Sequence, residues 1–147
     1  MPGLNSNLVD SLRKFIIDLP EYNQLNFNEE ELSIPLIEAA VKDGIMRFDL
    51  LPPISSTSAD SLLETSKHWY FIKRLSAVEA IQMIVFKNVR NKHTVSDPGM
   101  INVDEFDKAA EWDVVKNNII SEIEPKIIQY KRALSFAGMN AQIVSFL

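Results

Sequence analysis

The stretch KHWYFIKRLSAVEAIQMIVFKNVR, residues 67–90, decides the fold. An apolar stripe repeats along it at helical spacing, and its members are Ile72, Leu75, Val78, Ile81, Val85 and Val89. Ala77, Ala80 and Ile84 widen the stripe to a second side of the helix. A helix that is apolar on more than one side is usually buried, so we expect this one at the centre of the domain. Ser58 or Ser66 begins it, which places its start near residue 60 or 67.

The segments before this stretch predict two further helices. The first runs over about 7–18, because Leu8, Leu12 and Phe15 share one face, and Pro20 stops it. The second has two candidate starts. Either Asn28 caps a helix with three glutamates in its first turn and Pro35 kinks it, or Ser33 caps a helix with Pro35 in its permissive first turn. Pro52-Pro53 ends this helix.

The segment after residue 103 predicts a long last helix, from near Asp104 to Phe136. Its apolar residues advance at close to the α-helical repeat of about 3.6 residues, and they are Trp112, Val115, Ile119, Ile123, Ile127, Tyr130 and Leu134. Pro125 lies inside it and predicts a kink near 121–122 rather than a break. Gly138 is suited to cap its end.

The chain is therefore predicted to be mainly α, a bundle of about four to five helices. Asp97-Pro98-Gly99 has turn chemistry, which predicts a short β-hairpin or an extended loop between Asn91 and Val103, before the last long helix. We expect a helical domain over 1–138 and an extended apolar C-terminal tail over 139–147.

Composition limits the chemistry that this chain can perform. Its 147 residues are 46% hydrophobic and 24% charged, which is typical of one globular domain. The absence of cysteine excludes disulfides, thiolate metal sites and thiol nucleophiles. No run approaches the ~20 apolar residues of a membrane span, and the start of the sequence lacks a signal-peptide pattern. We expect a protein that lives or assembles inside a cell, with no membrane partner.

No catalytic, cofactor-binding or metal-binding residue is predicted. Four scattered glycines cannot form a phosphate-binding loop. The two histidines, His68 and His93, lie in no nucleophile motif, so we assign them structural roles. Glu29–Glu31 and the acidic residues 104, 105 and 107 are better explained as helix caps than as cation ligands.

Charge is spread unevenly along the chain. Residues 1–66 carry −7, residues 67–103 carry +4 and residues 104–147 carry −2, within a net charge of −5. The first two parts can pair within one subunit or between neighbours, or the unevenness arises by chance from solvated helix faces. Two basic clusters at expected helix ends do not make a nucleic-acid surface on an acidic protein, and we expect DNA contact only in passing. They are Lys87, Arg90, Lys92 and His93, and Lys126, Lys131 and Arg132.

Two segments are candidates for binding a partner protein. The charge-free tail offers Ile143, Val144, Phe146 and Leu147, which are a hazard if left in water. It either packs on its own domain or inserts into a groove or sheet edge of a partner. The predicted turn region adds the candidates Val95, Asp97, Pro98, Gly99, Met100 and Ile101.

The succession of motifs resembles the small helical head–tail connector proteins (adaptor, head-completion or neck proteins) of tailed bacteriophages. The matching segments span most of residues 8–136, and they are residues 12–15, 18–23, 27–32 and 39–41, Phe48, Pro52-Pro53, Arg90-Asn91, Asp97-Pro98-Gly99, residues 107–110 and Lys131-Arg132. Pro35 and Gly44 depart from the smooth second helix of that pattern.

The resemblance implies a non-enzymatic virion protein located in the neck and assembled in the host cytoplasm. Such proteins form a ring, commonly twelve-fold, that docks on the portal protein, meets tail or neck proteins and extends the channel through which DNA passes. The tail or the turn region would then reach into the portal or the next subunit. A non-catalytic protein-binding or regulatory module of the cell is the alternative.

Overall fold

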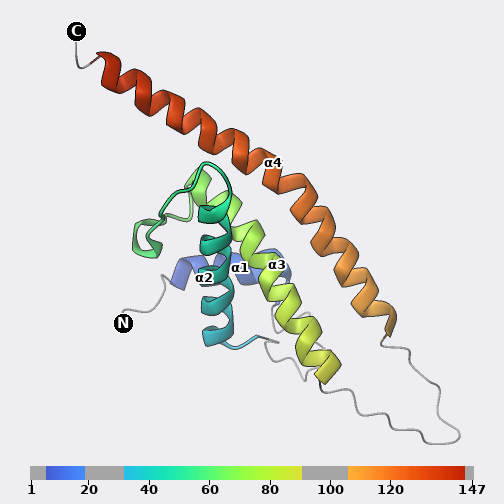
Figure 1. The fold of residues 1–147 in the computed structure, drawn as a ribbon. Coiled ribbons are helices and arrows are strands. Elements are labelled where there is room, and N and C mark those ends of the chain that lie inside the picture. The colour runs from blue at the N-terminus through green and yellow to red at the C-terminus, as the bar shows by residue number, and fades with distance from the viewer. Residues whose placement is uncertain (1–5, 19–31, 91–105, 145–147) are drawn as a thin grey trace, which may run out of the picture.

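A computed structural model describes residues 6–18, 32–90 and 106–144, apart from the side chains of residues 61, 88–90, 106–110 and 138–144. Four α-helices account for most of this part of the chain: α1 (Ser6–Ile16), α2 (Ile34–Leu50), α3 (Lys67–Arg90) and α4 (Phe106–Val144). A 3-10 turn, η2 (Ala59–Ser61), lies between α2 and α3. The described residues contain no strand, and the prediction of a mainly helical bundle is confirmed (Figure 1).

The central position of α3 confirms the main sequence prediction. α3 packs against α1, α2 and α4, and Figure 1 shows it between α2 and the long α4. Trp69, Ile72 and Leu75 are fully buried, as are the small residues Ala77 and Ala80. The two-sided apolar pattern therefore reflects the burial of α3 between several other helices, as expected for a core helix.

A serine lies at the start of both α2 and α3, although the Ser33 side chain makes no capping hydrogen bond. Ser33 has an extended backbone and precedes α2, with Pro35 in its first turn, so the second of the two predicted starts is confirmed. Residues 28–31 lie outside the described residues. Ser66 Oγ accepts a hydrogen bond from Trp69 N at 3.1 Å, and α3 begins at Lys67. The later of the two expected starts of this helix is thus confirmed.

α2 and α3 approach each other closely at Gly44. A methyl group on Gly44 would lie 2.7 Å from the backbone nitrogen of Ser76 and 2.9 Å from its Cα, closer than real contacts allow. Ser76 is itself fully buried, and its hydroxyl donates to the carbonyl oxygen of Ile72 at 2.8 Å. The glycine that departs from the expected helix pattern is therefore the point where the two backbones meet.

A buried ion pair closes the end of α1. Arg13 Nη1 lies 2.9 Å from Asp18 Oδ2, and both side chains are almost fully buried. The same carboxylate oxygen accepts the backbone N–H of Leu32 at 3.1 Å, just before α2. Ile17, directly before Asp18, has a φ of 59°, a left-handed conformation that branched residues rarely adopt. Asp18 thus ties the exit of α1 to the entry of α2.

α4 corrects the prediction for the end of the chain. The helix runs without a break through Pro125, as predicted, and then continues past Gly138 to Val144. The extended tail predicted from residue 139 is therefore wrong over 139–144. A glycine costs about 1 kcal/mol inside a helix, but adding a residue to a helix that has already formed is easy, and Ala141 and Gln142 favour it. Residues 145–147 lie outside the described part.

Candidate partner-binding surface

Lys131 anchors α4 to the end of α2. Its side chain is buried, and its ammonium donates to three carbonyl oxygens at the end of α2, those of Phe48 at 2.9 Å, Asp49 at 3.3 Å and Leu51 at 2.5 Å. The last carbonyls of a helix have no partner within the helix and carry partial negative charge. Lys131 satisfies them from another helix, although burial lowers its pKa below the usual value.

Asp49 organises the loop that follows α2. Its carboxylate accepts hydrogen bonds from the hydroxyls of Ser55 and Thr57, both at 2.7 Å, and from the backbone N–H of Thr57 at 2.8 Å. Burial on its own would raise the pKa of Asp49. The three hydrogen bonds and the nearby charge of Lys131 outweigh it and lower this pKa below 3.8. Asp49 therefore serves both features, because its carboxylate holds the loop while its backbone carbonyl accepts a hydrogen bond from Lys131.

Arg47 joins three helices. From α2 its guanidinium reaches Glu79 of α3 at 3.3 Å and Glu124 of α4 at 3.0 Å. All three side chains are about one-quarter to one-third exposed, so each ion pair alone contributes little. Their value is geometric, because a single planar group fixes the relative position of α2, α3 and α4.

His68 belongs to a ring cluster beside the same anchor. Its ring lies 5.7 Å from that of Phe48 and 5.4 Å from that of Tyr130, whose hydroxyl is 3.2 Å from His68 Nδ1. Tyr130 also contacts the ring of Phe71 at 5.0 Å. His68 is thus a partly buried ring packed between α2 and α4, and its structural role stays a prediction. His93 lies outside the described residues.

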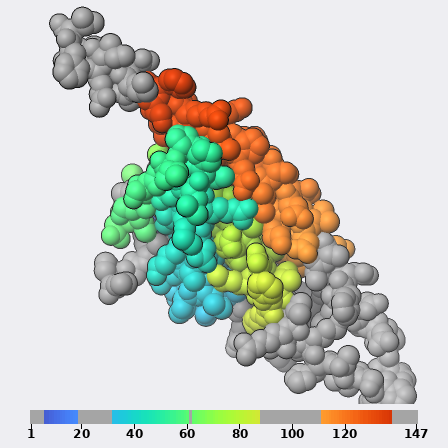
Figure 2. Space-filling model, in the orientation of Figure 1, coloured from blue at the N-terminus to red at the C-terminus, as the bar shows by residue number. Residues whose placement is uncertain are grey.

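Beyond Lys131, α4 leaves the body of the protein. Residues 132–137 are all exposed, including Leu134 at 45% and Phe136 at 66%. Ile123 and Ile127 in the middle of the same stripe are fully buried, whereas Val115 near its other end is 42% exposed. Figure 2 shows the last coloured part of α4 at the edge of the molecule. The apolar stripe is therefore longer than the surface that covers it.

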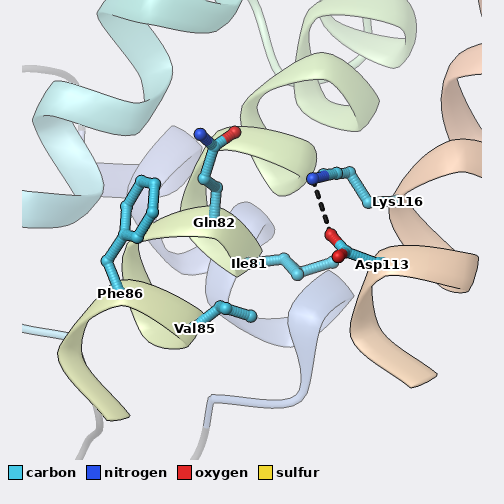
Figure 3. Close-up of a pocket in the computed structure, with 6 residues that line it drawn as sticks. All are labelled: Ile81, Gln82, Val85, Phe86, Asp113 and Lys116. Atoms are coloured by element: carbon cyan, nitrogen blue, oxygen red, sulfur yellow. Dashed lines mark hydrogen bonds and ion pairs between the residues drawn. The ribbon is translucent and has the colours of Figure 1, made fainter. Parts of the chain in front are cut away.

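An open hollow lies between α3 and α4. Its volume is about 200 Å³, and it is lined by Ile81, Gln82, Val85, Phe86, Asp113 and Lys116. Figure 3 shows Ile81 and Val85 extending from α3 toward α4, where Lys116 pairs with Asp113 at 2.7 Å. Small-molecule sites usually occupy about 300–1,000 Å³ and are enclosed. This hollow does not favour a cofactor site.

None of the predicted partner-binding side chains lies in the part of the chain that the structure describes. Ile143 and Val144 lie in the last turn of α4, and their side chains are outside the description. Phe146, Leu147 and the turn-region candidates of residues 95–101 lie outside the described residues altogether, as does the predicted hairpin. Leu134 and Phe136 are exposed but are not among the predicted partner-binding residues. The sequence signal for Leu134 is its place at the end of the periodic apolar stripe of the last helix.

The second basic cluster is not a shared surface. Lys131 is buried, Lys126 pairs with Glu122 at 2.6 Å, and Arg132 is exposed. All three lie inside α4 rather than at a helix end, which corrects the interpretation of this cluster as a helix terminus. In the first cluster, Lys87 is exposed on α3, and Lys92 and His93 fall outside the described part.

Metal-binding clusters and membrane-spanning helices are both absent from the described residues. No group of three or more His, Cys, Asp or Glu side chains there converges in a way that would hold a metal ion. Over the same residues, no helix combines the length and the apolar character needed to cross a bilayer. Comparison of the chain with protein-family models, with curated proteins and with solved structures finds no match.

Proposed function

We propose that this chain is a non-enzymatic structural protein of a virion, an adaptor that assembles into a ring in the neck between head and tail. In this proposal it docks on the portal protein, meets tail or neck proteins and extends the DNA channel. Its resemblance to phage head–tail connectors motivates the proposal. Assembly takes place in the host cytoplasm, and no cofactor or membrane is involved.

The observation that carries the proposal is the free end of α4. After Lys131 every side chain up to residue 137 is exposed, and two of them, Leu134 and Phe136, are large and apolar. Burying such a side chain contributes about 1.5–3 kcal/mol. A helix that is anchored at Lys131 and carries uncovered apolar residues beyond it is suited to hold another polypeptide.

The charge of the chain fits a channel protein that DNA only passes. A net charge of −5 does not favour phosphate binding, which needs several simultaneous cationic contacts. An acidic subunit ring would let the duplex slide without gripping it. DNA is therefore proposed as a passing contact and proteins as the lasting partners.

The mass of the assembled protein tests the proposal. We expect the purified full chain, alone or mixed with the proposed portal partner, to form a closed ring that sedimentation and electron microscopy detect. The double variant Leu134→Ser/Phe136→Ser should keep its helical content and lose docking or ring assembly. The matched control Arg132→Ser, which changes an exposed neighbour without removing apolar surface, should dock normally.

Two outcomes would contradict the proposal. A wild-type chain that stays monomeric with and without the portal is not a ring-forming adaptor. A monomer that binds one cellular protein through the same helix would instead support the alternative, a regulatory or protein-binding module of the cell.

A further inference from the structure

A cation held between two aromatic rings lies on the outer side of α1 and α3. The guanidinium carbon of Arg74 is 3.9 Å from the ring centre of Tyr70 and 5.4 Å from that of Phe15. Lys73 adds a second cation, 5.5 Å from the centre of the Phe15 ring. Tyr70 and Phe15 are both more than one-third exposed. We call Phe15, Tyr70, Lys73 and Arg74 the aromatic–cation patch.

Most of the hydrogen-bond donors of Arg74 have no partner within the described residues. A guanidinium has five N–H donors in its plane. Within the described residues the hydrogen bond found for Arg74 runs to the carbonyl oxygen of Tyr70, at a long 3.5 Å. A planar cation presented in this way is suited to a carboxylate, which it can bind through two parallel hydrogen bonds.

Glu122 of α4 interacts electrostatically with Arg74, but its closest partner is Lys126. The Lys126 hydrogen bond and charge, with a smaller contribution from Arg74, lower the pKa of Glu122. Glu122 and Lys126 pair with each other at 2.6 Å on α4. The patch therefore keeps a local positive charge on a protein that is acidic overall.

Exposed carboxylates lie on the loop between α2 and α3. Asp60 and Glu64 are both exposed, and no hydrogen bond or ion pair is found for either within the described residues. Leu63 beside them is 64% exposed, and Ile54 on the same loop is 80% exposed. We call Asp60, Leu63 and Glu64 the acidic loop. It offers the charge and the apolar surface that would complement the aromatic–cation patch.

The acidic loop leads directly into α3, whose first turns carry Tyr70, Lys73 and Arg74, yet no ion pair joins the two surfaces within the described residues of one chain. Figure 1 shows the loop between α2 and α3 projecting from one edge, whereas α1 ends behind α3, toward α4. A contact between two different surfaces of identical subunits is heterologous, and repeating it produces a ring when the rotation closes. The opposite charges of residues 1–66 and 67–103 match such a contact.

We infer that Arg74, between Phe15 and Tyr70, receives a carboxylate of the acidic loop from a neighbouring copy of this chain. The inference rests on the proposed ring, and it names the side chains that join one subunit to the next. Leu63 would pack against the exposed ring of Tyr70, and Asp60 or Glu64 would face the guanidinium edge.

Charge reversal in trans tests the inference. Full-length Arg74→Glu and Asp60→Lys/Glu64→Lys should each weaken self-association about tenfold or more, measured by sedimentation, because like charges would then face each other. An equimolar mixture of the two variants should assemble again as an alternating ring. Each variant then supplies the surface that the other has lost, and contacts within one chain could not give this rescue.

The test needs a control for the charge change itself. Lys42→Glu makes the same charge change at an exposed position of α2 and should not weaken assembly. The inference is overturned if both charge variants assemble as well as the wild type, or if mixing them restores no assembly. Neither outcome contradicts the proposed ring. A monomeric wild type overturns both the inference and the proposed ring. Binding of a fluorescent duplex that Arg74→Glu abolishes while assembly stays intact would show a phosphate site instead, and would also overturn the inference.

Discussion

The ammonium of Lys131 lies 2.9 Å from the carbonyl oxygen of Phe48, a residue 83 positions earlier in the chain. It also lies 4.9 Å from the centre of the Phe48 ring. One side chain of α4 therefore donates hydrogen bonds to the carbonyl oxygens at the end of α2 and covers the buried ring of Phe48. The end of α2 and the attachment of α4 depend on each other, and each is expected to weaken when the other is lost.

Replacing Lys131 by methionine should destabilise the whole bundle. Methionine keeps most of the volume, but the carbonyl oxygens of Phe48, Asp49 and Leu51 lose their shared donor in a buried place. Losing hydrogen bonds to a charged group typically costs about 1.5–3 kcal/mol. The free energy of unfolding from urea titration, followed by circular dichroism, measures this loss.

The matched control is Lys126→Met, five residues earlier on the same helix. Lys126 is half exposed and pairs only with Glu122 one turn away within the described residues, so its loss should be much smaller. Equal effects of the two substitutions would mean that Lys131 does not anchor α4.

The stability of the protein should fall in acid partly through Asp49. Its pKa is lower in the folded state than its ordinary value of 3.8. At pH values between the folded-state pKa and the ordinary pKa of Asp49, the unfolded state binds more protons than the folded state. The free energy of unfolding therefore decreases as the pH falls through this window. Above it, the contribution of Asp49 is fully present.

The variant Asp49→Asn isolates this contribution. At neutral pH it should be less stable than the wild type, because the charge toward Lys131 and part of the bonding to Ser55 and Thr57 are lost. The difference should shrink as the pH falls below 3.8 and vanish once Asp49 is protonated in both states. Urea midpoints at a series of pH values give this difference, and a difference that does not change with pH would contradict the assignment.

Gly44→Ala should destabilise the packing of α2 on α3, although alanine favours a helix. The added methyl group would meet the backbone of Ser76, which cannot move as a flexible side-chain end can. Overpacking of this kind costs about 1–3 kcal/mol, against a gain of about 1 kcal/mol in helix propensity. We expect a lower melting temperature, with exposed Lys42→Ala on the same helix as a near-neutral control. A stabilised Gly44→Ala would show that the helices can separate at no cost.

The sequence predicted the parts of the fold that depend on local patterns. The two-sided apolar pattern of residues 67–90 indicated the buried helix, and Ser33 and Ser66 marked the starts of two helices. Residues 139–144 were predicted wrongly because an uncharged apolar run has no periodicity that separates a continuing helix from an extended tail. Gly138 strengthened that error, since glycine ends many helices but is tolerated inside a long one.

The candidate surface depends on contacts between distant segments, which the sequence does not reveal. Lys131 was interpreted as a cation near a helix end, but its partners come from α2. Arg74 lies in the central helix α3, and the ring of Phe15 beside it comes from α1. Neither pairing follows from spacing along the chain. Leu134 could have been noticed, because it ends the periodic apolar stripe of the last helix, but its exposure follows only from where the other helices lie.

Ending the chain after Gly138 should leave the fold intact and abolish docking on the portal or ring assembly. The exposed residues 132–137 show that α4 has left the body before this point, so the anchor at Lys131 is kept. The truncation also keeps Leu134 and Phe136 but removes the predicted partner residues of the tail, so we expect docking to need both parts of the end of α4. We expect an unchanged melting temperature together with loss of the assembled species in sedimentation. The control is Arg132→Ser in the full chain, which keeps the end of α4. A truncated chain that unfolds would show instead that residues 139–147 pack on their own domain, and the partner role of the end of α4 would lose its basis.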